Sequence, residues 1–218
     1  MLDEDIGILA IELLPISMRI THPIPDRAST CTAILQILSS LGFDRFVLAA
    51  HSYGTVVATH MLHSPELNPR IATVLLMDPI PFLLHLPNVA YNFMYRKPRW
   101  ANEWQLWYFS SRDADVSRSL ARHFFWGENI LWKEELRGRP VAVSLSGSDQ
   151  IVDGEGVRKY LTGEGEMKEH WEQGGLEVLF YPGLDHATVF DTKERRKPLL
   201  RVLDKFVRAD EDGRLILV

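Results

Sequence analysis

The stretch 46-FVLAAHSYGTVVAT-59 decides the fold of this chain, because it has the pattern of a buried strand, a sharp turn and a helix. Apolar residues run into the turn and continue beyond it, and Ser52 lies at its centre. A serine at such a strand-to-helix turn takes strained backbone dihedrals, so the residues two before and two after it must be small. Ala50 and Gly54 meet that demand. The turn therefore gives the Ser52 hydroxyl the position of a nucleophile above the sheet edge.

The helix that follows this turn adds electrostatic stabilisation. Its N-terminus carries partial positive charge, and the backbone N–H of Tyr53 is expected to face the place where an oxyanion would form beside Ser52. We therefore predict that Tyr53 supplies one oxyanion donor. His51 directly precedes Ser52 and is expected to point away from it, as a packing or hydrogen-bonding group.

Two later strand ends carry the other residue types that a serine nucleophile needs. Residues 141–146 have the pattern of a strand and lead to Asp149, and residues 176–181 have the pattern of the next strand and lead to His186. Serine is a poor nucleophile at neutral pH, so an imidazole must take its proton and a carboxylate must orient that imidazole. We predict that Ser52 is the nucleophile, His186 the base and Asp149 the acid.

Two other aspartates remain as alternatives for the acid. Asp78 ends the predicted strand 71–77, where the motif Asp78-Pro79 is explained equally well as a strand-end cap, and Asp153 follows Asp149 closely. His60 and His63 share one helix face, but no third ligand with suitable spacing accompanies them, so a solvated face is favoured over a metal site.

Together these motifs resemble the α/β-hydrolase superfamily, of the serine hydrolase type, whose nucleophile motif is usually written G-x-S-x-G. Ala50 stands at the first glycine position, and serine, acid and histidine follow in the family's chain order. The resemblance covers about residues 6–207. It implies an α/β fold with a mostly parallel sheet flanked by helices, and neither a cofactor nor a metal ion. The tracts GILAIELLPISMRIT and LLMDPIPFLLHLPNVAYNFMYRKP are similar to an uncharacterised fungal branch whose longer members carry membrane segments upstream.

The strand and helix patterns alternate, which favours an α/β sheet. We expect a strand at 6–14 buried on both faces, a helix between Asp26 and Gly42, and a last helix that begins at Pro198. The predicted parallel order is that of the strands at 6–14, 46–49, 71–77, 141–146 and 176–181.

One strand of the family pattern is missing from this prediction. In α/β-hydrolases a further strand lies between those that correspond to residues 6–14 and 46–49, and it ends in a His-Gly loop that supplies the second oxyanion donor. The sequence begins too late to contain it. We therefore expect direct pairing or a gap between the first two strands, and a single domain, 1–218, that is incomplete at its N-terminus.

Residues 79–139 form an aromatic-rich insertion between two predicted strands. In the family this position holds a lid over the nucleophile, so the resemblance implies a lid here. Its aromatic rings could line a pocket for a bulky apolar group. We expect most of them to pack the lid onto the core. The basic residues within 94–99 could form a cationic rim, but a solvated face is favoured over it.

Composition excludes several classes of function. The net charge is −5 and the longest basic run is Arg195–Lys197, which argues against a nucleic-acid partner. One cysteine in 218 residues gives no internal disulfide, and no secretory signal or membrane-spanning stretch is visible. We expect a cytoplasmic protein, with longer relatives associated with membranes.

Two functions stay open on this sequence. The first is a serine hydrolase that cleaves a carboxylic ester, thioester or lactone of a bulky apolar substrate through an acyl-enzyme. The second is a weak or inert hydrolase-like protein whose apolar pocket binds a ligand or partner. The order of the three candidate residues favours the first, and the incomplete oxyanion site favours the second.

Overall fold

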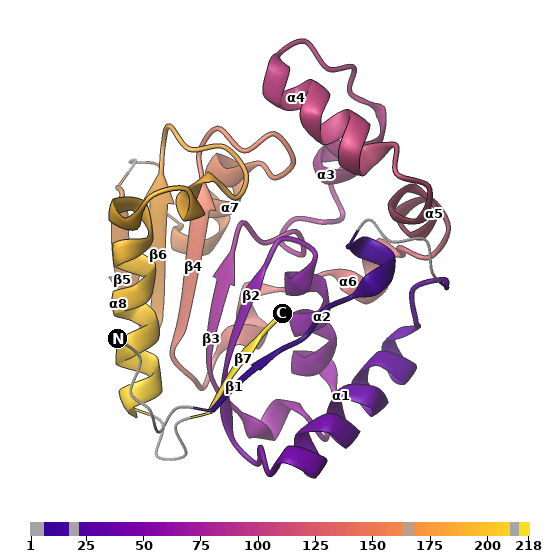
Figure 1. Ribbon diagram of the computed structural model, residues 1–218. Coiled ribbons are helices and arrows are strands. Elements are labelled where there is room, and N and C mark those ends of the chain that lie inside the picture. The colour runs from indigo at the N-terminus through magenta and orange to yellow at the C-terminus, as the bar shows by residue number, and fades with distance from the viewer. Residues whose placement is uncertain (1–6, 18–21, 164, 166–167, 210–213) are drawn as a thin grey trace.

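The computed structural model describes residues 7–17, 22–163, 165, 168–209 and 214–218, and they build one seven-stranded sheet flanked by helices (Figure 1). The strand order is β1-β7-β2-β3-β4-β6-β5, and all neighbours are parallel except the β5–β6 pair. The strands are β1 (Gly7–Ala10), β2 (Phe46–His51), β3 (Ile71–Met77), β4 (Val141–Ser146), β5 (His170–Gln173), β6 (Leu176–Tyr181) and β7 (Arg214–Leu217).

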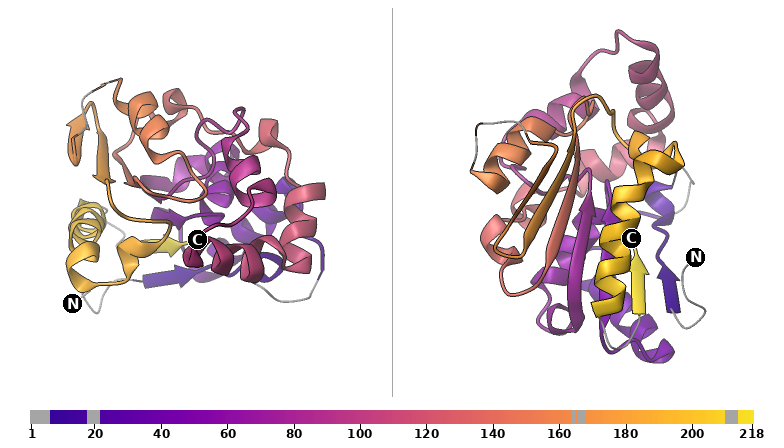
Figure 2. Two further views of the ribbon diagram at one scale, coloured as in Figure 1. Left: turned by 90° about the horizontal axis from the view of Figure 1, so that it is seen from above. Right: turned by 90° about the vertical axis from the view of Figure 1, so that its left-hand side faces the viewer.

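Long helices cover both faces of this sheet (Figure 2). Leu48, Leu76 and Val143 face one core layer, which also contains apolar residues of α1 (Arg27–Leu41), α2 (Gly54–His63) and α7 (Gly154–Thr162). Alternate strand residues such as Val47 and Leu75 face the other layer, against α8 (Lys193–Ala209). The near-continuous apolar runs of β2, β3 and β4 are explained by this burial on both faces.

The helix signals in the sequence hold at α1 and fail at α8. Asp26 caps α1 by accepting a hydrogen bond from the Ser29 N–H, and Gly42 ends it with a left-handed φ of 69°. Pro198 is not the first residue of the last helix, because α8 begins at Lys193 and Pro198 lies inside it.

Short 3₁₀ helices complete this part of the fold: η1 (Leu14–Ile16), η2 (Asn68–Arg70) and η6 (Thr188–Phe190).

The expected arrangement of the first strands is wrong, because β7 lies between β1 and β2. Gly7 pairs with Arg214 on one side of β7, and Val47 pairs with Leu215 on the other. The C-terminal strand therefore fills the position for which the sequence predicted direct pairing or a gap. The strand expected at 6–14 is also shorter, since β1 spans only Gly7–Ala10 and Ile6 lies outside the described residues.

β1 is not buried on both faces as expected. It is the edge strand of the sheet, its residues alternate between half-buried and exposed, and Ile8 is 47% exposed. The buried position next to β2 belongs instead to β7, where Ile216 is fully buried.

The insertion between β3 and β4 forms a set of short helices, and those of its first part project beyond the carboxyl ends of the strands (Figure 1). They are α3 (Asn88–Ala90), η3 (Tyr91–Tyr95), α4 (Ala101–Leu106), η4 (Trp107–Ser111), α5 (Ala114–Arg122), α6 (Trp126–Asn129) and η5 (Lys133–Leu136). Contrary to expectation, most of its aromatic rings do not pack inward: nine of the fifteen exposed large hydrophobic side chains that the structure describes are aromatic residues of this insertion.

No helix in the described part of the chain combines the length and the apolar character needed to cross a bilayer.

The central position of β7 can be tested by truncating its buried side chain. Ile216→Ala should lower the free energy of unfolding by about 2 to 5 kcal/mol, because it removes packed methylene groups and leaves a cavity. Urea denaturation measures this loss. Leu217→Ala is the matched control, since Leu217 is 36% exposed and should cost less than about 1 kcal/mol. Equally small losses for the two variants would contradict the observed sheet order.

Candidate active site

Ser52 lies in the turn between β2 and α2 with strained backbone geometry. Its φ of 52° is left-handed, as the small-x-Ser-x-small pattern predicts. The Ser52 N–H donates to the Met77 carbonyl at 3.0 Å, and the Ser52 carbonyl accepts from the Thr55 N–H and hydroxyl. A side chain at Gly54 would collide with the carbonyl group of Val218, directly after β7. Gly54 is therefore small because β7 passes close to the elbow.

His186 meets the serine from the turn after β6. Its Nε2 lies 2.8 Å from Ser52 Oγ, although the two residues are 134 positions apart in the chain. The His186 N–H donates to Asp185, and the following Ala187 has a left-handed φ of 64°. The turn thus fixes the imidazole toward the end of β2.

Asp149 reaches the other side of the same imidazole. Its Oδ2 lies 2.8 Å from Nδ1 of His186, and its side chain is 1% exposed. The second oxygen, Oδ1, accepts from the N–H groups of Ile151 and Val152. With the proton on Nδ1, the imidazole donates to Asp149 and leaves Nε2 free to accept the Ser52 hydroxyl proton. The structure therefore brings together the three residues that the sequence predicted as nucleophile, base and acid.

Asp78, the alternative acid, makes no hydrogen bond to His186. Its Oδ1 accepts from the Ser146 N–H at 3.0 Å, and its Oδ2 accepts from the Ala187 N–H at 2.9 Å. Asp78 is 1% exposed, and its Oδ2 lies 3.7 Å from Nε2 of His51. This carboxylate ties the end of β3 to the end of β4 and to the histidine turn. Asp153, the third candidate, caps α7 by accepting from Gly156 N–H.

Sequence reasoning missed Asp185, which connects both turns to the insertion. Its Oδ1 accepts from the N–H groups of His186 and Gln150, and its Oδ2 accepts from the side chains of Gln150 and Asn102. Asn102 lies on α4. In the sequence, the only sign of a role for Asp185 is its position directly before His186. Its partners could not be predicted because they come from three separate parts of the chain.

The acidic groups around His186 set its protonation. Burial alone lowers the pKa of His186, but the hydrogen bond and charge of Asp149, with the charges of Asp78 and Asp185, raise it above the ordinary 6.5. Burial alone raises the pKa of Asp78, but His51, His186 and the two N–H donors outweigh burial, so its pKa lies below 3.8. Asp78 therefore stays ionised at neutral pH beside the imidazole.

The backbone N–H of Tyr53, which the sequence predicts as an oxyanion donor, lies directly after Ser52 at the start of α2. No hydrogen bond from the Tyr53 N–H is found among the described residues, which leaves this group available to an incoming oxygen. Beside Ser52, the chain directly after β7 continues the pairing with β2, where Val218 exchanges backbone hydrogen bonds with Ala49 and His51.

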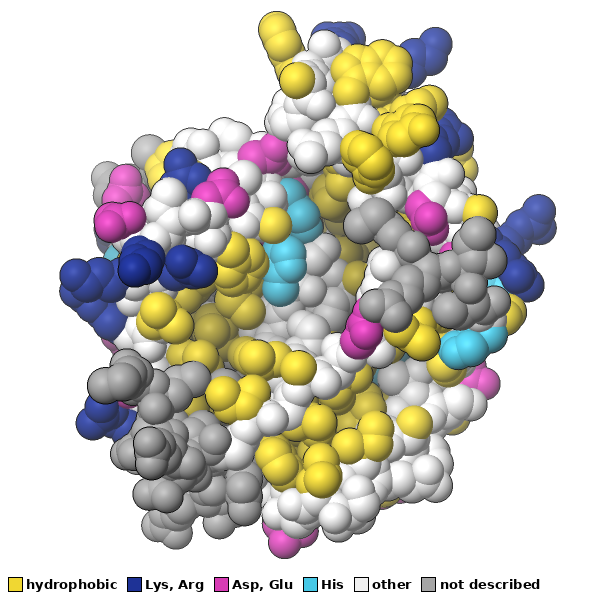
Figure 3. Space-filling model, viewed as in Figure 1, with side chains coloured by type: hydrophobic (Ala, Val, Ile, Leu, Met, Phe, Trp, Pro, Cys, Tyr) yellow, Lys and Arg dark blue, Asp and Glu magenta, His cyan; other side chains and the backbone are white. Residues whose placement is uncertain are grey.

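Ser52 and His186 open into a cavity of about 750 Å³. Figure 3 shows histidine side chains beside a hollow in this face of the molecule. The insertion supplies most of the cavity wall, with apolar side chains that include Leu84, Val89, Phe93, Met94, Leu106, Leu120 and Phe124. The candidate nucleophile is therefore exposed to an apolar chamber.

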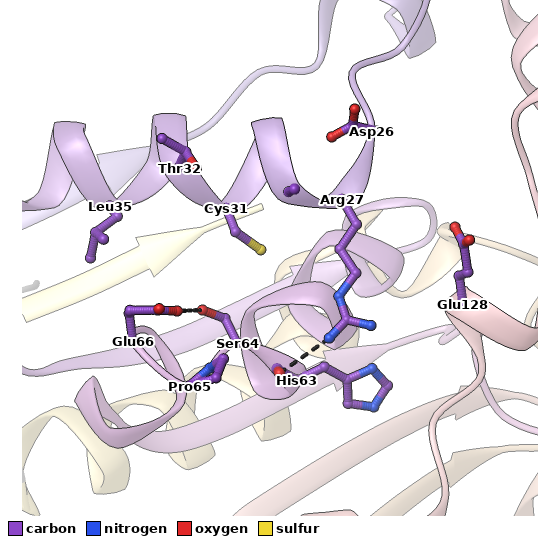
Figure 4. Close-up of a pocket in the computed structure, with 11 residues that line it drawn as sticks. Asp26, Arg27, Cys31, Thr32, Leu35, His63, Ser64, Pro65, Glu66 and Glu128 are labelled. Carbon is purple, nitrogen blue, oxygen red and sulfur yellow. Dashed lines mark hydrogen bonds between the residues drawn. The ribbon is translucent and has the colours of Figure 1, made fainter.

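A second cavity, of about 610 Å³, lies between α1 and the end of α2 (Figure 4). There Arg27 donates to the His63 carbonyl, and the Ser64 hydroxyl donates to Glu66. Cys31 points toward α2, where its thiol donates to the His60 carbonyl, and burial raises the pKa of that thiol. Arg27 and Cys31 of α1 thus join this helix to backbone carbonyl groups at the end of α2.

His60 and His63 do not share a solvated face as expected. Nε2 of His60 lies 2.7 Å from Oδ1 of Asn129, and Nε2 of His63 lies 2.8 Å from Oε1 of Glu135, so each contacts a separate group.

Two groups in the described ranges have closely spaced metal-ligand atoms. They are the buried set Asp78, Asp149 and His186, and the more exposed set His170, Glu172 and Glu177. In the first, the His186–Asp149 hydrogen bond uses one imidazole nitrogen, and in the second Lys205 pairs with both glutamates.

Comparison with known proteins supports the fold. No protein-family model matches this chain, and no curated protein sequence matches it significantly. Solved structures do match: the carboxylesterase CesB from Bacillus subtilis aligns with a TM-score of 0.58 at 14% identity, over 95% of this chain and 86% of its own. The enol-lactonase from Burkholderia xenovorans aligns with a TM-score of 0.56 at 11% identity, over 93% and 91%. An α/β-hydrolase fold protein from Chitinophaga pinensis aligns with a TM-score of 0.52 at 14% identity, over 95% and 90%. This chain therefore has the α/β-hydrolase fold.

The role of Asp78 as a tie between strand ends predicts a pH-dependent contribution to stability. Asp78→Asn should lower the free energy of unfolding by about 1 to 3 kcal/mol at pH 7, because an amide nitrogen cannot accept from a buried N–H. Since the folded-state pKa of Asp78 is lowered, the stability it contributes is present above 3.8 and lost as pH falls through the folded value.

Urea denaturation at several pH values measures this effect. The difference between wild type and Asp78→Asn should narrow below pH 3.8. Asp204→Asn, on the exposed face of α8, is the control and should change stability by less than about 0.5 kcal/mol. A difference that stays constant, or widens, as pH falls would contradict the ionised state of Asp78.

Proposed function

We propose that this chain is a serine hydrolase that cleaves a carboxylic ester, thioester or lactone through an acyl-enzyme. The observation that carries the proposal is the chain of hydrogen bonds Ser52–His186–Asp149, which opens into an apolar cavity. Carboxylesterases and an enol-lactonase share the fold, which supports this class of reaction. Serine in the elbow argues against the chemistries of this fold that use aspartate as nucleophile.

The proposed reaction has two halves. His186 Nε2 takes the Ser52 proton as Oγ attacks the substrate carbonyl carbon, and the Tyr53 N–H stabilises the oxyanion. The imidazolium, held by Asp149, then gives the proton to the leaving group, which departs as an alcohol from an ester or as a thiol from a thioester. Water attacks the acyl-enzyme in the second half, with His186 again as base, and Ser52 is regenerated with release of the acid.

The cavity supports a bulky apolar substrate. Its wall offers Phe93, Leu106 and Phe124 to the acyl or alcohol part, while polar groups gather at Ser52 and His186. Residues 79–139 would act as the lid of this chamber, and the whole chain as one domain. The expected cytoplasmic location and the place in a fungal branch stay predictions.

A second candidate function is a weak or inert hydrolase-like protein that binds an apolar ligand. The observation that favours it is the position of β7, because this strand fills the sheet position between β1 and β2 where the family pattern has the strand that ends in the His-Gly loop. Loss of one such donor typically costs about 10² to 10³ in turnover. Labelling of the serine distinguishes the two functions.

The role of Ser52 is tested by active-site labelling. The purified protein should react with a fluorophosphonate probe at Ser52. It should hydrolyse p-nitrophenyl esters slowly, because the Tyr53 N–H would stabilise the oxyanion without a second donor. Ser52→Ala should abolish labelling and reduce turnover by about a million-fold or to the limit of detection. Ser40→Ala, an exposed serine on α1, is the control. Absence of labelling in folded protein would leave the binding function.

The pH dependence of turnover tests the base and the acid. Only neutral His186 can accept the serine proton, and its pKa is raised, so kcat/KM should rise with pH through a value above 6.5. Asp149→Asn should reduce turnover by about 10⁴, because the imidazole loses its orienting acceptor. Asp78→Asn removes a nearby negative charge and should move the profile to lower pH with a smaller loss of rate. The reverse pattern would make Asp78 the acid.

A further inference from the structure

Exposed aromatic side chains gather on one part of the insertion. They come from α3–η3, the loop after it and the continuous helical segment α4–η4, and Figure 3 shows hydrophobic side chains there beside basic ones. Their exposed fractions are 56% for Tyr91, 74% for Tyr95, 71% for Trp100, 52% for Trp104, 67% for Tyr108 and 57% for Phe109. Water contact of so many large rings is unfavourable, so this surface is the strongest candidate for an interaction site.

Helical spacing places several of these rings on one face. Trp100, Trp104, Tyr108 and Arg112 follow at intervals of four and are exposed, whereas Leu106 faces inward and lines the cavity. Tyr108 packs edge-on against Phe109, with ring centroids 5.1 Å apart. One side of α4–η4 therefore faces the candidate active site, and the other presents an aromatic surface to the solvent.

The charge of this segment is opposite to that of the whole protein. Residues 88–125 contain six basic residues and three acidic ones, a net charge of +3, although the chain as a whole carries −5. Of the acidic residues, Glu103 accepts from the N–H groups of Arg99 and Trp100 and pairs with Arg96, and Asp113 caps α5. Lys97, Arg99 and Arg112 remain exposed among the rings.

We propose that this aromatic and basic surface, residues 91–112, docks the protein onto an anionic lipid bilayer. Tryptophan and tyrosine favour the boundary between headgroups and acyl chains, and lysine and arginine are attracted to anionic headgroups. Aromatic residues and arginine are also enriched at protein interfaces, so a protein partner is the alternative that the test separates. The net positive charge of this surface on an acidic chain favours an anionic bilayer. Rings at the level of the headgroups and basic groups on the headgroups make this an interfacial contact.

Hydrogen bonds connect this surface to the loops of the candidate site. Asn92 donates to the Ile151 carbonyl, Arg96 donates to the Gln150 carbonyl, and Asn102 donates to Asp185. Docking would therefore hold the wall of the cavity against the lipid, and the ester would come from the bilayer. This last step rests on the proposed function, whereas the docking itself does not.

Vesicle co-sedimentation in the absence of substrate tests the docking. Wild-type protein should bind vesicles of phosphatidylcholine with about one third phosphatidylglycerol at least about tenfold more tightly than pure phosphatidylcholine vesicles. Raising the salt from about 0.1 to about 0.5 M should remove most of that preference. The triple variant Trp104→Ser, Tyr108→Ser, Phe109→Ser and the double variant Lys97→Glu, Arg99→Glu should each reduce binding at least about tenfold.

Matched controls change the same kinds of side chain elsewhere. Ile37→Ser, Leu41→Ser, Leu200→Ser removes three exposed apolar side chains, and Lys197→Glu, Arg201→Glu reverses two exposed charges on α8. Both should bind vesicles like wild type, and circular dichroism confirms that every variant is folded. No vesicle binding by wild type, or equal losses in surface variants and controls, would overturn the proposal. A wild-type dimer in analytical ultracentrifugation that the triple variant dissociates would assign the surface to self-association instead.

Because binding is measured without turnover, its failure is separate from failure of the hydrolase proposal. Ser52→Ala should retain full vesicle binding, since Ser52 lies outside the docking surface.

Discussion

A single buried carboxylate, that of Asp78, holds the ends of two parallel strands and the turn after a third in one arrangement. Asp78 ends β3 in a left-handed conformation with a φ of 44°, its N–H donates to the Ser144 carbonyl, and its two oxygens accept from Ser146 and Ala187. An ionised group without such partners would be very costly in a buried position. Because Asp78 binds Ser146, where the turn that carries Asp149 begins, and Ala187, directly after His186, the geometry of the candidate active site depends on these contacts.

The parallel strands at the centre of the sheet could be predicted because their sequences report burial on both faces. β3, β4 and β6 have the residue ranges that their apolar runs indicate, and Ser52, Asp149 and His186 follow from their positions at strand ends. The carboxyl ends of parallel strands lie along the same edge of a sheet, so residues that follow these ends come close enough to form hydrogen bonds. The fold assignment rests on this part of the chain.

β5 and β7 could not be predicted, because their short sequences do not indicate which strands they pair with. β5 has the polar sequence HWEQ and is held by its antiparallel partner, and β7 is a four-residue run. The strands that pair with β7, which are β1 and β2, lie near the opposite end of the sequence. The partners of Asp185 and the outward direction of the insertion's rings are likewise tertiary features, since each depends on segments that only the folded chain brings together.

The position of β7 also sets the order in which this protein can fold. Val47 pairs with Leu215, so the central part of the sheet is closed by a contact that spans more than 160 positions. During synthesis β2 is complete long before its partner leaves the ribosome, and one edge of β2 stays open throughout. Such non-local pairing slows folding and exposes unpaired strand edges to other chains. Aggregation of nascent chains is therefore a hazard that this topology carries, and a chaperone that shields the β2 edge would relieve it.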